Sequence, residues 1–137
     1  RSDTASFGGS RLIRNFSAVT AAALAIRKEV FDKVNGLDEL NLEVAFNDVD
    51  FCLRVAAAGY RNLYTPYCEL YHHESLSRGS DVAGEKALRF QKEVRHMQNK
   101  WSDIIANDPY YNPNLSLIHG FSLDANRGNS WPWEKDV

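Results

Sequence analysis

Three stretches of the chain have apolar residues at intervals of three and four, the spacing of a helix with one buried face. They are residues 28–34, 48–58 and 85–101. Asn35-Gly36 and Gly59 follow the first two, and such residues tolerate the left-handed conformation that ends a helix. In the third stretch the apolar positions are Phe90, Val94, Met97 and Trp101. The pattern therefore predicts three helices.

Two other stretches are typical of strands. Residues 19–26 are small and apolar with β-branched residues near both ends, which favours a buried strand over a helix. Residues 60–71 form a second strand, broken at Pro66 because proline removes a hydrogen-bond donor from the ladder. The segments 1–16, 37–45, 75–84 and the chain after residue 101 show no period and are predicted as loops. The order strand, helix, helix, strand, helix predicts an α/β or α+β layer.

The start of the helix over residues 48–58 is rich in capping residues. Asn47 is a good N-cap, and Asp50 three residues later resembles a capping box with Asp in place of Glu. Asp50 and Arg54 are four residues apart, so we expect them to pair along the exposed side of the helix.

The composition is ordinary for a globular domain, with 137 residues of which 44% are hydrophobic and 25% charged. A formal net charge of -2 argues against nucleic-acid binding, which needs a basic surface. No apolar run approaches the roughly 18 residues of a membrane span. Cys52 and Cys68 are too few for a disulfide scaffold, so we expect buried, reduced thiols in a cytosolic setting.

Two clusters of residues carry candidate chemistry. Asp48 and Asp50 stand in one helical turn, where carboxylates either stabilise the helix start or act as a general base. His72-His73-Glu74 follow the second strand and are candidates for metal binding. Adjacent residues on a strand point to opposite faces, so one histidine is expected to be a packing or solvent residue.

Other residues have a functional and a structural interpretation. Arg78 and Lys86 could face a phosphate, although charged loop residues are usually only solvated. The aromatic residues of the C-terminal region could form a sugar-stacking platform or cover the edge of the core. They are Tyr110, Tyr111, Trp131 and Trp133.

The motifs together resemble a known family. The segments VTAAALAIRKEVFDKVNGLDE, FNDVDFCLRVAAAGYRNLYTPYCELYHHESLSRG and DPYYNPNLS resemble the C-terminal half of family-two glycosyltransferases. These are inverting enzymes of the GT-A fold that often act on bacterial cell-surface polysaccharides. The likeness covers residues 19–116 and implies the C-terminal part of a GT-A fold, of α/β class. We then expect a loop over residues 1–18, a mixed sheet with packed helices over 19–116, and a loop-rich tail over 117–137.

The resemblance also implies a catalytic base. Asn47-Asp48 stands where the family usually has Glu-Asp, and this Asp is the base toward the acceptor hydroxyl. Asp48 is therefore the expected base, with Asp50 beside it in the turn as an acceptor- or donor-binding residue. Thr20, in the small-residue segment, would line the acceptor side.

The metal and leaving-group residues come from the next motif. His72, with His73 as the alternative, matches the C-terminal histidine that helps hold a divalent metal, Mg²⁺ or Mn²⁺, under the diphosphate. Arg78 would lie near the leaving group. Asp48-Val49-Asp50 has the Asp-x-Asp form of the family's metal motif, but it lies in the base motif and is not assigned to the metal.

The expected partners are a nucleotide-sugar donor, a saccharide acceptor and the N-terminal half of the same domain. That half carries the nucleotide-binding region in the family. The chain begins at Arg1 without Met, and we expect the isolated 137-residue chain to be an inactive fragment. The expected location is the cytoplasm or the inner face of the membrane, with no membrane span and no nucleic-acid partner.

Two alternatives belong to other classes. A non-catalytic carbohydrate-binding or assembly module would use the aromatic tail for stacking and Asp48 as a helix cap. A small zinc-binding domain would use His72, His73, Cys52 and Cys68, whose spacing matches no usual zinc arrangement.

Overall fold

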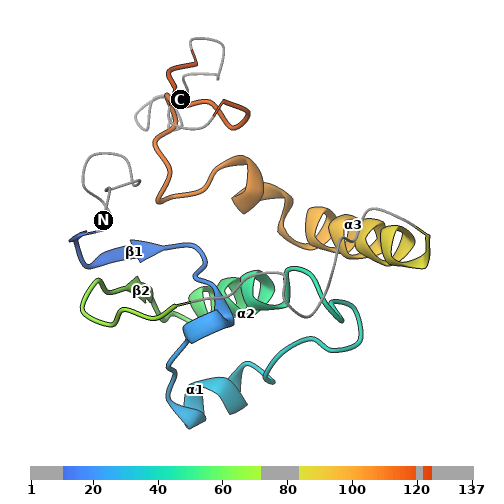
Figure 1. Cartoon of the computed structure of the whole chain (residues 1–137), viewed down its shortest axis with the longest axis horizontal. Coiled ribbons are helices and arrows are strands. Elements are labelled where there is room, and N and C mark those ends of the chain that lie inside the picture. Colours follow the sequence, from blue (N-terminus) through green and yellow to red (C-terminus); the bar gives the residue numbers. More distant parts are fainter. Residues whose placement is uncertain (1–10, 72–83, 120–121, 125–137) are drawn as a thin grey trace, which may run out of the picture.

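The computed structural model describes residues 11–71, 84–119 and 122–124. In chain order its elements are β1 (Arg14–Phe16), the 3-10 turn η2 (Ala21–Ala23), α1 (Lys28–Lys33), α2 (Asn47–Ala57), β2 (Asn62–Tyr64) and α3 (Glu85–Ala106). In Figure 1, α2 lies in the middle, with the two-stranded sheet and α3 on different sides of it and α1 below. The predicted mixture of α and β structure is therefore confirmed, while its assignment to the GT-A fold stays a prediction.

The core consists of two apolar clusters on different faces of α2. In the first, Phe51 and Val55 pack against Val30 and Val34, from α1 and the residue that ends it. In the second, Leu53 packs against Leu42 and against Met97 of α3. Helix α2 is thus covered on two faces, because Phe51 and Val55 contribute to the first cluster and Leu53 to the second.

The sheet has two antiparallel strands of three residues each, with Arg14 opposite Tyr64 and Phe16 opposite Asn62. It is joined to α2 by the side-chain amide of Asn62, a buried residue. This amide donates to the carbonyl oxygens of Ser17 at 3.0 Å and Cys52 at 2.9 Å. The predicted mixed sheet is thus, among the described residues, a purely antiparallel pair of strands.

The predicted strand over residues 19–26 is wrong, since this segment is largely exposed and contains only the turn η2. Here side-chain oxygens accept hydrogen bonds from backbone N–H groups that would otherwise bond to the carbonyl groups of a neighbouring strand. Ala22 N donates to Thr20 Oγ1 at 3.3 Å and Ala21 N donates to Asp48 Oδ2 at 3.1 Å. The predicted loop over 1–16 instead contains β1, and the strand predicted over 60–71 is shorter, covering only residues 62–64.

The three helices are confirmed, with changes at their ends. Helix α3 continues to Ala106, although the backbone of Trp101 departs from helical geometry. Helix α2 begins at Asn47, but the capping position belongs to Phe46, in the left-handed region at φ 62° with no capping side chain. The prediction that Asn47 caps the helix is therefore wrong. No helix in the described ranges has the length and apolarity needed to cross a lipid bilayer.

Replacing Gly36 by alanine should destabilise the protein more than the same change at Gly59. Both glycines have positive φ, at +62° and +88°, which costs an L-residue about 1–2 kcal/mol. A Cβ at Gly36 would also lie 2.9 Å from Cζ of Phe31, whose ring packs on Phe51, whereas nothing lies within 4 Å of one at Gly59. We expect Gly36→Ala to cost about 0.5–1.5 kcal/mol more than Gly59→Ala, the range for an aromatic pair. Chemical denaturation measures both, and equal losses would contradict the steric argument.

Candidate functional site

Asp48 lies in the first turn of α2 and is partly exposed. Its two carboxylate oxygens accept from different backbone amides, Oδ1 from Val49 N at 2.9 Å and Oδ2 from Ala21 N at 3.1 Å. Each carboxylate oxygen has two lone pairs, so these bonds orient the group and leave acceptor capacity for another molecule.

The segment that carries Thr20 lies against the same end of α2. Its neighbour Ala21 bonds Asp48, and Val19 bonds Cys52, four residues further along the helix. The Cys52 thiol also donates to Val19 O at 3.6 Å. Burial raises the pKa of this thiol, and the nearby Asp48 charge adds to the effect. The structure therefore brings together Asp48 and Thr20, two of the predicted site residues.

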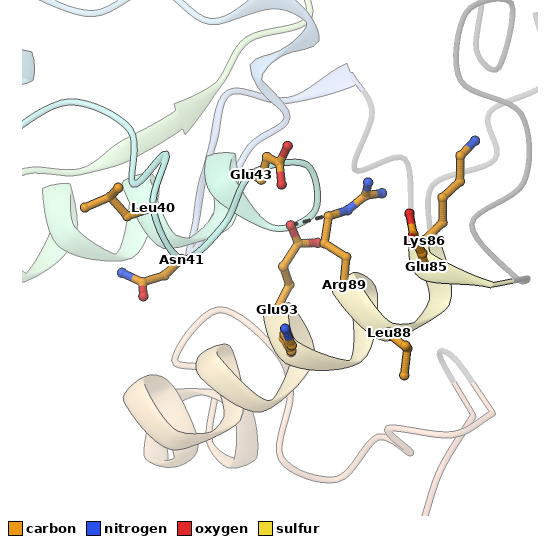
Figure 2. Close-up of a pocket in the computed structure, with 9 residues that line it drawn as sticks. Leu40, Asn41, Glu43, Glu85, Lys86, Leu88, Arg89 and Glu93 are labelled. Carbon is orange, nitrogen blue, oxygen red and sulfur yellow. Dashed lines mark ion pairs between the residues drawn. The ribbon is translucent and has the colours of Figure 1, made fainter.

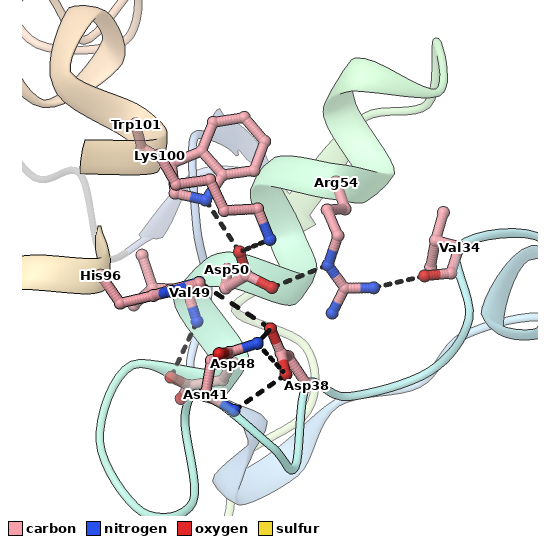
Figure 3. Close-up of polar contacts among 10 residues, drawn as sticks. All are labelled: Val34, Asp38, Asn41, Asp48, Val49, Asp50, Arg54, His96, Lys100 and Trp101. Atoms are coloured by element: carbon pink, nitrogen blue, oxygen red, sulfur yellow. Dashed lines mark hydrogen bonds and ion pairs between the residues drawn. The ribbon is translucent and has the colours of Figure 1, made fainter. Parts of the chain in front are cut away.

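Asp50 is in a different environment, although it lies two residues from Asp48. Side chains two apart on a helix project about 200° from each other. Figure 3 shows Asp50 pointing toward Arg54 on the same helix and Lys100 and Trp101 on α3. Its carboxylate is fully buried. Oδ2 lies 2.7 Å from Arg54 Nε, and Oδ1 lies 2.8 Å from both Lys100 Nζ and Trp101 Nε1.

These four residues, Asp50, Arg54, Lys100 and Trp101, are called the Asp50 cluster below. The predicted Asp50–Arg54 pair is confirmed, but it lies on a buried side of α2 rather than the exposed side. Trp101 is the residue at which α3 loses helical geometry, and it and the preceding Lys100 bind the same oxygen of Asp50. Asp50 has no exposed surface, so a role in binding donor or acceptor stays a prediction that its burial argues against.

Glu93 of α3 was not among the predicted site residues. Its side chain is 2% exposed, and its oxygens accept from the consecutive amides of Val44 at 2.9 Å and Ala45 at 3.1 Å. These amides directly precede Phe46, whose left-handed backbone costs about 1–3 kcal/mol and persists only where neighbours enforce it. Glu93 lies four residues before the buried Met97, and this shared helix face was the only sequence signal for its burial.

A groove of about 570 Å³ lies next to Glu93, between the start of α3 and the connection before α2. Figure 2 shows its walls, with Leu40 and Glu43 on one side and Arg89 on the other. Arg89 Nε lies 3.8 Å from Glu93 Oε1. The remaining lining residues include Glu85, Lys86 and Lys92, so charges of both signs line the groove. Lys86, a candidate phosphate contact, therefore faces a groove of mixed charge.

Several predicted residues lie outside the described part of the chain: His72, His73, Arg78, Trp131 and Trp133. The metal site and the leaving-group contact therefore stay predictions. Within residues 11–71, 84–119 and 122–124, no group of three His, Cys, Asp or Glu side chains could hold a metal ion.

Both cysteines and the two candidate tyrosines, Tyr110 and Tyr111, lie within the described residues. Cys52 is buried and free, as predicted, but Cys68 is exposed, so the prediction of a second buried thiol is wrong. The Tyr111 hydroxyl donates to the carbonyl of Ser116 at 2.7 Å, which gives this ring a structural contact, whereas Tyr110 is exposed.

Asp50→Asn should destabilise the protein strongly. The substitution leaves buried cationic donors without a charged acceptor, and breaking a buried pair in this way costs about 3–5 kcal/mol. The matched control is Asp32→Asn, because Asp32 pairs with Lys28 at a similar distance, 2.6 Å, but with both side chains exposed. That pair should be worth less than about 0.5 kcal/mol. Denaturant unfolding of both variants tests the difference, and similar losses would show that burial does not set the value of the Asp50 pair.

The Asp50 cluster should also make stability depend on pH on the acid side. Burial alone would raise the pKa of Asp50, but hydrogen bonds from Lys100, Trp101 and Arg54 outweigh it and hold the pKa below its ordinary value of 3.8. The folded carboxyl therefore binds a proton less readily than the unfolded one. Its contribution is fully present above pH 3.8 and is lost as the pH falls through the lower folded value. The free energy of unfolding of Asp50→Asn, measured down to acid pH, should fall less steeply than that of the unsubstituted protein.

Comparison with known proteins finds relatives by sequence only. No protein-family model and no solved structure matches the chain. The chain is 55% identical over 107 residues to uncharacterized protein y4gI of Sinorhizobium fredii, which covers 78% of this chain and 12% of that protein. It is 37% identical over 111 residues to the O-antigen biosynthesis protein RfbC of Myxococcus xanthus, covering 81% of this chain and 8% of that one.

A third relative is the N-acetylglucosaminyl-diphospho-decaprenol L-rhamnosyltransferase of Mycobacterium tuberculosis, 33% identical over 84 residues. The match covers 61% of this chain and 27% of the transferase. The chain thus spans less than a third of the length of each of these relatives. The names of the second and third relatives point to a glycosyltransferase family.

Proposed function

We propose that this chain is the part of a glycosyltransferase that supplies the catalytic base and the acceptor side of the active site. The observation that carries the proposal is the position of Asp48, a partly exposed carboxylate oriented by two backbone amides next to the Thr20–Ala21 turn. The similarity to RfbC and to a rhamnosyltransferase supports sugar transfer as the reaction. The sugar would pass from a nucleotide-sugar donor to a saccharide acceptor with inversion.

In this mechanism Asp48 accepts the proton of the acceptor hydroxyl while that oxygen attacks the anomeric carbon. The bond from the anomeric carbon to the nucleoside diphosphate breaks, and the diphosphate leaves with the electron pair. The unused lone pairs of the Asp48 carboxylate can accept the proton. Thr20 presents an exposed side chain on the acceptor side.

The leaving group would be stabilised by other parts of the protein. A divalent cation, Mg²⁺ or Mn²⁺, would neutralise the developing charge on the diphosphate when bound. His72, with His73 as the alternative, would supply one ligand and Arg78 a further positive charge. A single imidazole is too few ligands for a metal site, so the others would come from the N-terminal half of the domain and from the diphosphate.

The activity of the whole protein is part of the same proposal, because the chain spans only a fraction of its relatives. We propose bacterial surface polysaccharide as the acceptor class and the N-terminal half of the domain as the partner that binds the nucleotide. The reaction would take place in the cytoplasm or at the inner face of the membrane.

Asp48→Asn in the full-length protein that contains this chain should abolish transfer. Loss of a general base typically lowers the rate by about 10²–10⁴-fold. Stability should change by no more than about 1.5 kcal/mol, since asparagine keeps one oxygen acceptor and loses one partly exposed hydrogen bond. The readout is nucleoside diphosphate released in the presence of the acceptor, with denaturant unfolding measured in parallel.

Asp32→Asn is again the matched control, because Asp32 is an exposed carboxylate on a different helix, α1. It should leave transfer unchanged. Full transfer by Asp48→Asn would rule out the proposed base and favour the non-catalytic carbohydrate-binding or assembly module, in which Asp48 is only a helix cap.

A further inference from the structure

The proposed chemistry does not use Glu93, although it is one of the most buried ionisable groups among the described residues. A carboxylate at 2% exposure is costly unless it is paired. Glu93 meets this cost with two backbone donors, Val44 N at 2.9 Å and Ala45 N at 3.1 Å, and with Arg89 at 3.8 Å. The two backbone bonds join α3 to Val44 and Ala45, which lie 49 and 48 residues earlier in the chain.

That segment leads directly into the turn that carries Asp48. Phe46 adopts the left-handed conformation at φ 62°, and its carbonyl accepts the first helical bond, from Asp50 N at 2.9 Å. The ring of Phe46 packs on Phe90 of α3, with centroids 5.6 Å apart. Glu93 and Phe90 thus hold the residues immediately before this turn, and both belong to the same helix.

A second connection lies further along α3. Lys100 and Trp101 bind Asp50, which stands two residues after Asp48. Glu93 and Lys100 are seven residues apart, about 10 Å along a helix. The first turn of α2 is therefore attached to α3 both before and after Asp48. The amides that hold Asp48 itself set its orientation only within α2 and the residue-21 turn.

We propose that Glu93 is a positioning residue for sugar transfer: by binding Val44 N and Ala45 N it sets the direction in which α2 begins, and so the direction in which Asp48 points. The inference rests on the proposed function, since it needs Asp48 to be the base. A displacement of about 1 Å at a catalytic group can cost 10²-fold in rate. Glu93 would thus contribute to kcat without touching either substrate.

The test is Glu93→Gln in the full-length protein. Glutamine keeps one oxygen acceptor but presents an NH₂ group to the other amide, so one of the two bonds is lost. We expect kcat to fall about 10- to 100-fold, with the KM for the nucleotide sugar changed less than about twofold because no substrate contact is removed. The donor is the one that the unsubstituted enzyme turns over in a panel of UDP-, GDP- and dTDP-linked hexoses. Hydrogen exchange at Val44 and Ala45 should become faster.

The decisive comparison repeats Glu93→Gln in an Asp48→Asn background. If Glu93 acts through Asp48, it should lower the residual rate no further, because residues that act as a unit are not additive. Glu85→Gln, an exposed change on the same helix, should have no effect in either background. Glu93→Asp keeps the charge and withdraws it by one methylene group, so it replaces Glu93→Gln if that variant does not fold, with a smaller expected loss of kcat.

The outcomes separate the two proposals. An unchanged kcat per folded molecule, or an equal loss in both backgrounds, would overturn the role of Glu93 and leave the base intact. If Asp48→Asn alone retains full activity, the proposed base fails, and the positioning role fails with it.

Discussion

The arrangement of the helices depends on one carboxylate that is removed from water. Asp50 is fully buried, and an unpaired charge in that position would cost several kcal/mol. Its donors come from two helices, α2 and α3, so the helices cannot separate without removing Lys100 and Trp101 from the buried carboxylate. Arg54 also donates to the carbonyl of Val34, at the end of α1. A single negative charge therefore connects all three helices.

The same helical turn shows how environment separates two chemically identical side chains. Asp50 is surrounded by side-chain donors and holds the structure together, whereas Asp48, within the described residues, accepts hydrogen bonds from backbone amides and remains partly exposed. Backbone amides orient a carboxylate without neutralising it by a full opposite charge. Burial and the kind of donor, rather than residue type, therefore leave Asp48, and not Asp50, accessible for the proposed role as the base.

Local interactions could be predicted from the sequence, and long-range ones could not. Helix spacing identified α1 and α3, and Asn35-Gly36 marked the end of α1, because these signals act within a few residues. The start of α2 was predicted wrongly because its geometry is set by Glu93, on a helix distant in sequence, rather than by a cap at Asn47. The apolar pattern around Thr20 predicted a strand, but the backbone N–H groups of this segment bond to side chains instead, one of them the distant Asp48.

The candidate site could be predicted in part, and by resemblance more than by pattern. Spacing alone left Asp48 as either a cap or a base, and the family likeness chose between them. It also placed Thr20 on the acceptor side, and the structure brings Thr20 next to Asp48 through Ala21 N. Nothing in the local sequence marked Asp50 as buried, since the α3 residues that cover it, Lys100 and Trp101, lie about fifty residues further along the chain; Trp101 is 51 residues away.

The pairing of β1 with β2 has a consequence for how the protein folds. Asn62 and the carbonyl of Ser17 are 45 residues apart, and α1 and α2 lie between them in the chain. Closing a loop of this length costs entropy before its contacts form, so such pairings tend to form late. The segment that follows β1 carries Thr20 and the amide that binds Asp48, and it would dock together with the strand. The β1–β2 pairing and the α2–α3 contact between Asp50 and Trp101, 51 residues apart, therefore close loops of similar length and carry similar entropic costs.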